Sequence, residues 1–224
     1  QVSDQWWNKF KNKELSMRHY KPEEEDVLFT RAALAMCENI DWNVGRIMKK
    51  IEDLGLAENT LIVYFSDNGP NSWRWNGGMK GRKGSTDEGG VRSPLFLKWE
   101  GVLEGGKKIG TIAAVIDLLP TLADMAGIDL KTDKPLDGVS LKPLLTSTNC
   151  EWEERFVFSH WNGQISVRSQ RFRLDDEGRL FDMEHEAGQT IDVSASFPEI
   201  VRQMKEARAK WERDVLSELP VEDT

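Results

Sequence analysis

An acidic and an amide side chain, Asp67 and Asn68, stand next to each other directly after the apolar run TLIVYF. Carboxylate and carboxamide oxygens are ligands that hard cations such as Ca²⁺ and Mg²⁺ accept. Neighbours in a regular strand point to opposite faces, so both residues can serve one ion only in an irregular turn. Gly69 and Pro70 supply such a turn. Ser-Asp-Asn-Gly taken by itself is more often an ordinary turn, and the pair is therefore a candidate half of a metal site.

The segment 69–93 that follows contains seven glycines and three cationic residues of interest, Arg82, Lys83 and Arg92. Glycine lets the backbone approach a bound group closely, and a lysine held among glycines can contact an oxyanion as a point charge. For Arg82 and Arg92 the alternative is a solvated or structural ion pair.

Other side chains could line a binding site. Trp73, Arg74 and Trp75 follow the Asp-Asn pair, and aromatic faces suit a sugar or an aryl group; loop packing is an equally good explanation. His160 follows an expected strand in FSHW, where a lone histidine is more often structural than a contact to substrate.

Regular elements must position these residues. Apolar residues at helical spacing from Ile40 to Leu54 predict an amphipathic helix that begins near Asp26 and ends at Gly55. TLIVYF has the continuous apolar, β-branched character of a strand covered on both faces, as in α/β sheets, and PLFLKW predicts a second strand. A helix with Asp117 as its N-cap is expected over AVIDLLPTLADMAG.

The pattern changes after Asn149. Four short runs, RFVFSHW, ISVRS, RFRLD and GRLFDM, predict an antiparallel meander. Ser196 and Glu199 have the spacing of a capping box, with Pro198 in the first turn of a last helix. We therefore expect an α/β part over residues 1–148 and a small antiparallel sheet with a helix over 149–224.

Composition limits the class of function. The chain has 224 residues, of which 39% are hydrophobic, and a formal net charge of −8. This charge disfavours nucleic-acid binding, which needs clustered Lys and Arg. The chain contains no run of 18 apolar residues, so the sequence predicts no membrane-spanning helix. Cys37 and Cys150 do not have the spacing of a metal or redox motif.

Several of these segments together resemble the sulfatase family of arylsulfatases and carbohydrate sulfatases. TLIVYFSDNGP and KGSTDEGGVRSPLFLKWEG carry the strongest likeness. The helix before that strand, IDLLPTLADMAG, LDGVSLKPLL and GRLFDMEHEAGQTIDV match family segments in the same order, so the resemblance covers about residues 26 to 215.

The resemblance implies part of an alkaline-phosphatase-like sheet with flanking helices, and hydrolysis of sulfate esters. It implies that Asp67 and Asn68 are ligands of a divalent cation, usually Ca²⁺, and that Lys83, rather than Lys80, binds the sulfate of a sulfated small molecule or glycan. Many members are exported, which is compatible with a periplasmic or secreted protein, although the residues themselves leave the compartment undetermined.

The chain lacks two features of the family pattern. It lacks the Cys/Ser-x-Pro/Ala-x-Arg motif that yields the formylglycine nucleophile, and the paired aspartates that complete the metal site. Both belong to the family's N-terminal half. We therefore expect the chain to be the C-terminal portion of a longer sulfatase, and to be inactive by itself.

Two alternatives stay open at this point. One is a related phosphoryl or phosphonate hydrolase with a similar metal strand. The other is a non-catalytic binding module, in which the apolar strand edge at TLIVYF would need a cover. A second copy of the chain could supply that cover through self-association.

Overall fold

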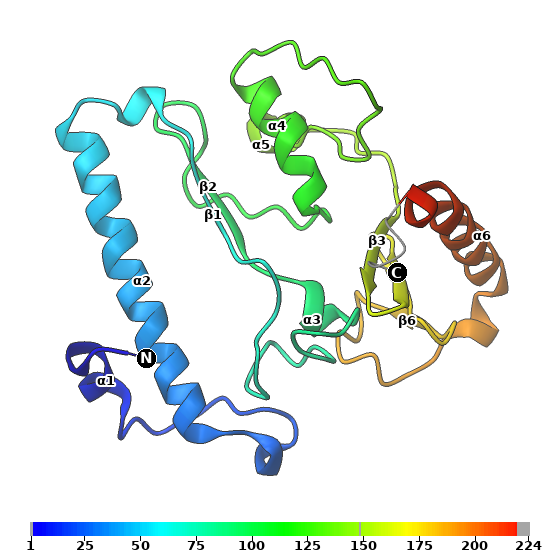
Figure 1. Cartoon of the computed structure of the whole chain (residues 1–224), viewed down its shortest axis with the longest axis horizontal. Helices are drawn as coiled ribbons and strands as arrows, with labels where there is room; N and C mark the ends of the chain where they lie inside the picture. Colours follow the sequence, from blue (N-terminus) through cyan, green and yellow to red (C-terminus); the bar gives the residue numbers. More distant parts are fainter. Residues whose placement is uncertain (1, 148, 219–224) are drawn as a thin grey trace.

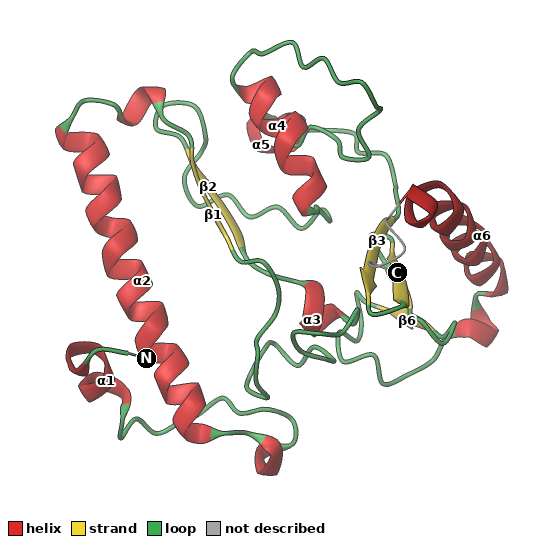
Figure 2. Cartoon of the chain, in the orientation of Figure 1, coloured by secondary structure: helices red, strands yellow, loops and turns green. Residues whose placement is uncertain are grey.

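The computed structural model describes residues 2–147 and 149–218, which form an open arrangement (Figure 1). A long helix, α2 (Val27–Asp53), lies on one side, a ribbon of two strands lies in the middle, and a four-stranded sheet with helix α6 (Pro198–Val215) lies on the other side (Figure 2). Short helices fill the connections: η1 (Pro22–Glu24), η2 (Ala57–Asn59), α3 (Glu88–Val91), η3 (Val115–Asp117), α4 (Leu118–Met125), α5 (Lys142–Thr146), η4 (Ser194–Ser196) and η5 (Leu216–Glu218).

The predicted amphipathic helix is confirmed as α2 (Val27–Asp53). The Asp26 carboxylate caps it by accepting a hydrogen bond from the Phe29 amide at 2.9 Å, and Gly55 follows its end with a positive φ of 67°. Helix α1 (Asp4–Phe10) packs on α2 through Trp6 and Trp42, whose ring centroids are 5.8 Å apart. Much of the predicted apolar face of α2, including Ile40, Ile47 and Leu54, is exposed.

Both predicted strands of the first part are confirmed. Strand β1 (Ile62–Phe65) pairs antiparallel with β2 (Leu95–Lys98). The expectation that β1 is covered on both faces is wrong for the described residues, because Phe65 and Phe96 are exposed, Phe96 by 62%. Within residues 2–147 and 149–218, β1 pairs with β2 and with no other strand, so no further strand extends the ribbon.

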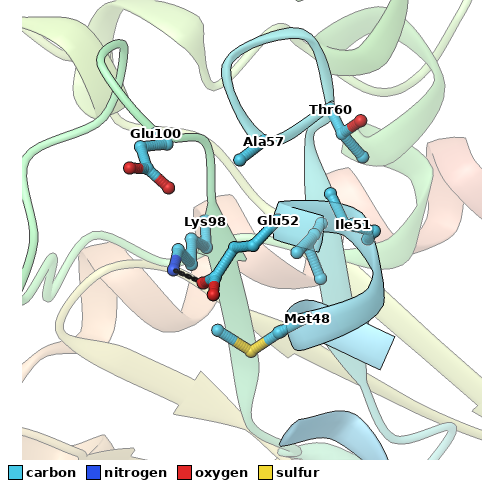
Figure 3. A pocket seen from close by; sticks show the side chains of 8 residues that line it. Met48, Ile51, Glu52, Ala57, Thr60, Lys98 and Glu100 are labelled. Carbon is cyan, nitrogen blue, oxygen red and sulfur yellow. Dashed lines mark ion pairs between the residues drawn. The ribbon is translucent and has the colours of Figure 1, made fainter. Parts of the chain in front are cut away.

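The end of α2 meets this ribbon at a small cavity (Figure 3). Glu52 of α2 and Lys98 of β2 form an ion pair of 3.9 Å across it, and Met48 and Ile51 lie against it. Its volume of about 10 Å³ is close to the space of one water molecule. The cavity is therefore too small for a substrate.

The predicted C-terminal meander is confirmed. Strands β3 (Val157–Trp161), β4 (Gln164–Arg168), β5 (Phe172–Leu174) and β6 (Leu180–Asp182) follow one another in an antiparallel sheet of that order. Asn162 and Gly163, both with positive φ, form the two-residue turn between β3 and β4.

Helix α6 (Pro198–Val215) covers one face of this sheet. The buried core between them consists of Val167, Phe172, Leu174, Leu180 and Met204. The predicted capping box is wrong. Ser196 ends the 3₁₀ turn η4, Phe197 is the N-cap without a side-chain hydrogen bond, and Glu199 instead pairs with Arg202 at 2.5 Å.

Asp117 precedes α4 as expected, but its carboxylate does not cap that helix. It is fully buried, accepts hydrogen bonds from the amides of Ala114 at 2.7 Å and Val139 at 3.0 Å, and pairs with Arg155. Burial opposes ionisation of Asp117, yet Arg155 and the two amides outweigh it and hold the pKa of the carboxyl below its ordinary value.

The described helices include none that combines the length and apolarity of a membrane span, in agreement with the sequence. The division of the chain at residue 148 stays a prediction. The ion pair between Asp117 and Arg155 crosses it.

Candidate functional site

Asp67 and Asn68 lie in the turn just beyond the carboxyl end of β1. The Asn68 side-chain amide donates a hydrogen bond to the carbonyl of Gly69 at 2.8 Å, which orients the side chain and leaves its oxygen available as an acceptor. Asp67 is exposed and has no cationic partner within 4.0 Å among the described residues. A free carboxylate beside an oriented amide oxygen suits a hard divalent cation.

The glycine-rich loop is bound to this turn through the backbone. The Gly69 amide donates to the Gly90 carbonyl at 2.8 Å, and the Lys83 amide donates to the Pro70 carbonyl at 2.9 Å. A Cβ atom on Gly69 would lie 1.8 Å from the carbonyl oxygen of Gly89, so only glycine fits there. The Asp-Asn turn and the loop that carries Lys83 therefore form one backbone unit.

Lys83 lies between two glycines, whose lack of side chains leaves the lysine accessible to a bound anion. Gly81 and Gly84 both have φ of +86°, a region that other residues rarely adopt. The Lys83 side chain is exposed, and no carboxylate of the described chain lies within ion-pair distance of it. Lys80, by contrast, pairs with Asp87 at 3.2 Å. Lys83 is thus the lysine of this loop that is available to an anion.

Glu88 anchors the loop to the C-terminal sheet. Its side chain is buried, with 4% of the residue exposed, and its carboxylate pairs with Arg173 at 2.8 Å, Arg168 at 3.2 Å and Arg92 at 3.3 Å. Burial opposes ionisation of this carboxyl, but the charges of Arg173 and Arg168 outweigh it and keep its pKa below the ordinary value.

Further hydrogen bonds join the same elements. The Thr86 carbonyl accepts from Arg173 at 2.7 Å and from the Ser166 hydroxyl at 2.7 Å, while Gln189 accepts from the Glu88 amide at 2.9 Å. The sequence analysis missed these supporting residues. The sequence feature that could have identified them is the charged Arg173 in the middle of the apolar strand β5, because a charge at such a position needs a buried partner.

The structure places the remaining predicted residues apart from one another. Arg74 is half-buried without a carboxylate partner in the described part, and burial lowers the pKa of its guanidinium, an effect that the nearby Cys37 thiol partly offsets. Trp75 is exposed. His160 faces α6, with its ring centroid 6.5 Å from that of Trp211. Their contact with substrate stays a prediction.

Trp161, which the sequence analysis did not single out, lies beside the loop instead. Adjacent residues of a strand face opposite sides of a sheet, so Trp161 points away from the side on which His160 meets α6. Its indole nitrogen is 3.7 Å from the place that a Cβ atom on Gly84 would occupy. Trp161 thus stands next to Gly84, the residue that follows Lys83 in the chain.

An open hollow of about 300 Å³ lies over this loop. Its lining includes Tyr20, Trp73, Lys80, Arg82, Lys83 and Asp87. Three cationic side chains and one carboxylate give it a positive balance within a chain whose net charge is −8. The arrangement can hold an anionic group at Lys83, next to the Asp67–Asn68 turn.

Comparison with known proteins decides the family. The family model described as Sulfatase matches residues 6–128. The chain belongs to the sulfatase family. Its turn at Asp67 and its loop at Lys83 are therefore sulfatase segments, and both lie inside the matched range.

Similar curated proteins are sulfatases of different kinds. The steryl-sulfatase of Rattus norvegicus is 37% identical over 144 residues, which is 60% of this chain and 25% of that protein. Arylsulfatase A of Homo sapiens is 45% identical over 144 residues, 60% of this chain and 28% of that protein. A sulfatase of Formosa agariphila is 31% identical over 199 residues, 73% of this chain and 35% of that protein. The chain thus spans about a quarter to a third of the length of these relatives.

Solved structures share the fold. The crystal structure of Ps i-CgsB has a TM-score of 0.75 and 26% identity, and it covers 94% of this chain, which corresponds to 46% of that chain. The protein yidJ from Bacteroides fragilis, described as a putative sulfatase, has a TM-score of 0.73 at 18% identity, which shows likeness of fold only. The α/β fold of the chain is therefore part of an alkaline-phosphatase-like sulfatase fold, as the sequence predicted.

Proposed function

We propose that this chain supplies the cation-binding and sulfate-binding part of the active site of a sulfate ester hydrolase. Asp67 and Asn68 hold a divalent cation, Ca²⁺ in the first instance, and Lys83 binds the sulfate group of a sulfated small molecule or glycan. Membership of the sulfatase family supports the reaction class.

One observation carries the proposal. Asp67 and Lys83 are 16 positions apart in the sequence, yet the hydrogen bonds from Gly69 to Gly90 and from Lys83 to Pro70 join their two backbone segments directly. A metal turn and a sulfate-binding lysine must lie together if one sulfate group is to contact both. The glycines allow this close approach of the two segments.

The donor set fits the cation in type but supplies only part of a site. Ca²⁺ takes 6–8 oxygen ligands, and this turn offers one carboxylate and one amide oxygen. When bound, the cation polarises the sulfate group as a Lewis acid. Lys83 stabilises negative charge on the sulfate oxygens as the S–O bond breaks. The ion pairs of Glu88 with Arg173 and Arg168 keep the loop that carries Lys83 in place.

We further propose that the remaining ligands and the formylglycine nucleophile come from a segment outside these 224 residues. Covalent catalysis needs that nucleophile, and the Cys/Ser-x-Pro/Ala-x-Arg motif that yields it does not occur in the chain. The 224-residue chain by itself is then expected to bind without turnover. Metal-dependent hydrolysis of a sulfate ester by the isolated chain would refute this part of the proposal.

The direct test measures hydrolysis of 4-nitrophenyl sulfate and glucosamine 6-O-sulfate by the natural protein that contains this chain. Lys83→Met is expected to lower kcat/KM by about 10²–10³, the range for loss of a charge-stabilising group in an active site. Lys98→Met, which alters an exposed lysine of β2, is the matched control and should leave the rate unchanged. Equal rates for Lys83→Met and wild type would contradict the role of Lys83.

The same assay separates the alternatives. Hydrolysis of a phosphate or phosphonate ester in preference to a sulfate ester would favour the related phosphoryl hydrolase. Sulfate binding by the natural protein without turnover would favour a non-catalytic binding module. Self-association through the free edge of β1 is also a proposal, and a monodisperse monomer of the chain in light scattering would count against it.

A further inference from the structure

The hollow beside Lys83 has two features that a simple sulfate site does not need. One is a second cation, Arg82, and the other is an aromatic wall, which consists of the rings of Tyr20 and Trp73. Tyr20 and Trp73 line the hollow together with Arg82 and Lys83, and Trp161 stands next to Gly84. Tyr20 is 62% exposed and Trp161 is 59% exposed, so both rings are accessible to a ligand.

Arg82 is held in place by an aromatic ring and by its own turn. Its guanidinium carbon lies 4.8 Å from the centroid of a ring of Trp73. Its carbonyl accepts hydrogen bonds from the Ser85 amide and the Ser85 hydroxyl, both at 3.1 Å. No acidic side chain of the described residues forms an ion pair with Arg82. The structural ion pair considered from the sequence is therefore not what holds this residue.

Tyr20 comes from a distant part of the sequence, and the buried His19 anchors it against Trp73. His19 is only 3% exposed, and its ring lies between Tyr20 and Trp73, with centroid distances of 4.1 Å and 5.1 Å. The His19 amide donates to the buried Glu25 carboxylate at 3.0 Å, and the Thr30 hydroxyl of α2 donates to the same group at 2.8 Å. The start of α2 thus fixes the wall against the loop that carries Arg82.

Deepening the proposed function, on which this inference rests, we infer that the hollow is a subsite for a sulfated sugar that carries a second anionic group. With the reacting sulfate at Lys83, the sugar ring lies on the aromatic wall, because the C–H faces of a sugar pack on aromatic rings. The second sulfate or carboxylate binds Arg82, whose planar fork suits such groups.

The chemistry of the lining separates this ligand from other sulfate esters. A steroid sulfate or a simple aryl sulfate has one anionic group, for which one cationic side chain would be enough. This hollow instead has the cations Lys80, Arg82 and Lys83 against the single carboxylate of Asp87, which is already paired with Lys80. The excess positive charge matches a ligand with more than one negative charge.

The test is calorimetric titration of the 224-residue chain at low salt with four probes: inorganic sulfate, N-acetylglucosamine, N-acetylglucosamine 6-O-sulfate and glucosamine 2-N,6-O-disulfate. The N-acetyl group is uncharged, so the two sulfated sugars differ by one anionic group, and the disulfated one is expected to bind about tenfold more tightly, as for one added charge-assisted contact. Arg82→Gln should remove that difference. Arg46→Gln is the matched control, because Arg46 also stacks on an indole, that of Trp42, on α2, and it should keep the difference.

Two further variants separate this inference from the proposed function. Tyr20→Ala is expected to weaken binding of both sulfated sugars but not of inorganic sulfate. Lys83→Gln should weaken binding of inorganic sulfate and of both sugars, and a normal sulfate affinity in this variant would contradict the proposed function. The subsite inference is overturned if Arg82→Gln leaves the preference for the disulfated sugar intact, if wild type has no such preference, or if it binds neither sulfated sugar.

Discussion

Replacing Glu88 by glutamine tests how the sulfate-binding loop is held on the C-terminal sheet. The wild-type carboxylate is almost fully buried and accepts hydrogen bonds from Arg173 at 2.8 Å and 3.2 Å and from Arg168 at 3.2 Å. The variant removes the negative charge and turns an NH₂ group toward two guanidinium groups. Removing one partner of a buried ion pair costs about 3–5 kcal/mol. Because the glutamine oxygen still accepts one hydrogen bond, we expect a loss of about 3 kcal/mol.

Urea unfolding followed by tryptophan fluorescence measures this loss as a lower midpoint at unchanged slope. Glu199→Gln is the control, since Glu199 also pairs with an arginine, Arg202, but on the exposed surface of α6. Such pairs contribute little, so the control should have the midpoint of wild type. A Glu88→Gln variant within about 1 kcal/mol of wild type would refute the reasoning, because a buried ion pair predicts a larger cost.

The same variant has a pH signature. The folded-state pKa of Glu88 lies below its ordinary value, so its contribution to stability is fully present above about pH 4.3, the ordinary pKa of a glutamate. That contribution is lost as the pH falls through the lower folded-state pKa. The stability difference between wild type and Glu88→Gln should therefore shrink in acid, and a difference that is constant from pH 7 to pH 3 would contradict the account.

Two other predictions concern the loop and the sheet. Gly69→Ala places a Cβ atom 1.8 Å from the Gly89 carbonyl oxygen, so it should separate the Asp-Asn turn from the Lys83 loop and weaken sulfate binding. Titration with sulfate measures this loss, and Gly45→Ala is the control because its added atom meets nothing within 4 Å. An unchanged sulfate affinity in Gly69→Ala would argue against the backbone unit. Asp182 is paired with Arg171, which contributes most to lowering its pKa to about 2. Its stabilisation is lost as the pH falls from about 4 to about 2, so the acid unfolding curve of Asp182→Asn should be flatter there, and a curve parallel to wild type would rule this out.

Local pattern was enough to predict the elements and the family. The period of α2, the β-branched run of β1 and the four short strands of the meander are encoded in neighbouring residues, and the structure has all of them. The chain's membership of the sulfatase family rests on the ordered motifs, and the family model confirms it.

Tertiary context decided what pattern could not. The period of α2 identified an apolar face, but whether Ile40 and Ile47 are buried depends on what packs there, and in the described residues they are exposed. The capping box at Ser196 failed because a 3₁₀ turn precedes α6. Glu88 and Arg173 are 85 positions apart in the sequence, and no short-range signal joins them.

The candidate site, too, was predictable from sequence in part and depended on tertiary contacts for the rest. The type and spacing of Asp67, Asn68 and Lys83 made them candidates from sequence, and the structure adds the backbone bonds that bring their segments together. Trp161 lies beside Gly84 only because the meander packs on the glycine-rich loop. Its neighbour His160, which the sequence offered as a candidate although a structural role was the more frequent one, faces Trp211 of α6 because side chains alternate along β3.

We propose that Asp67, Asn68 and Lys83 bind a cation and a sulfate group at one site. The most direct test is titration of inorganic sulfate into the 224-residue chain with and without millimolar Ca²⁺. A shared site predicts that Ca²⁺ tightens sulfate binding, and by reciprocity that sulfate tightens Ca²⁺ binding. Asp67→Asn should remove this coupling, and Lys83→Gln should weaken sulfate binding in both conditions. A sulfate affinity that is the same with and without Ca²⁺ in wild type would contradict the account.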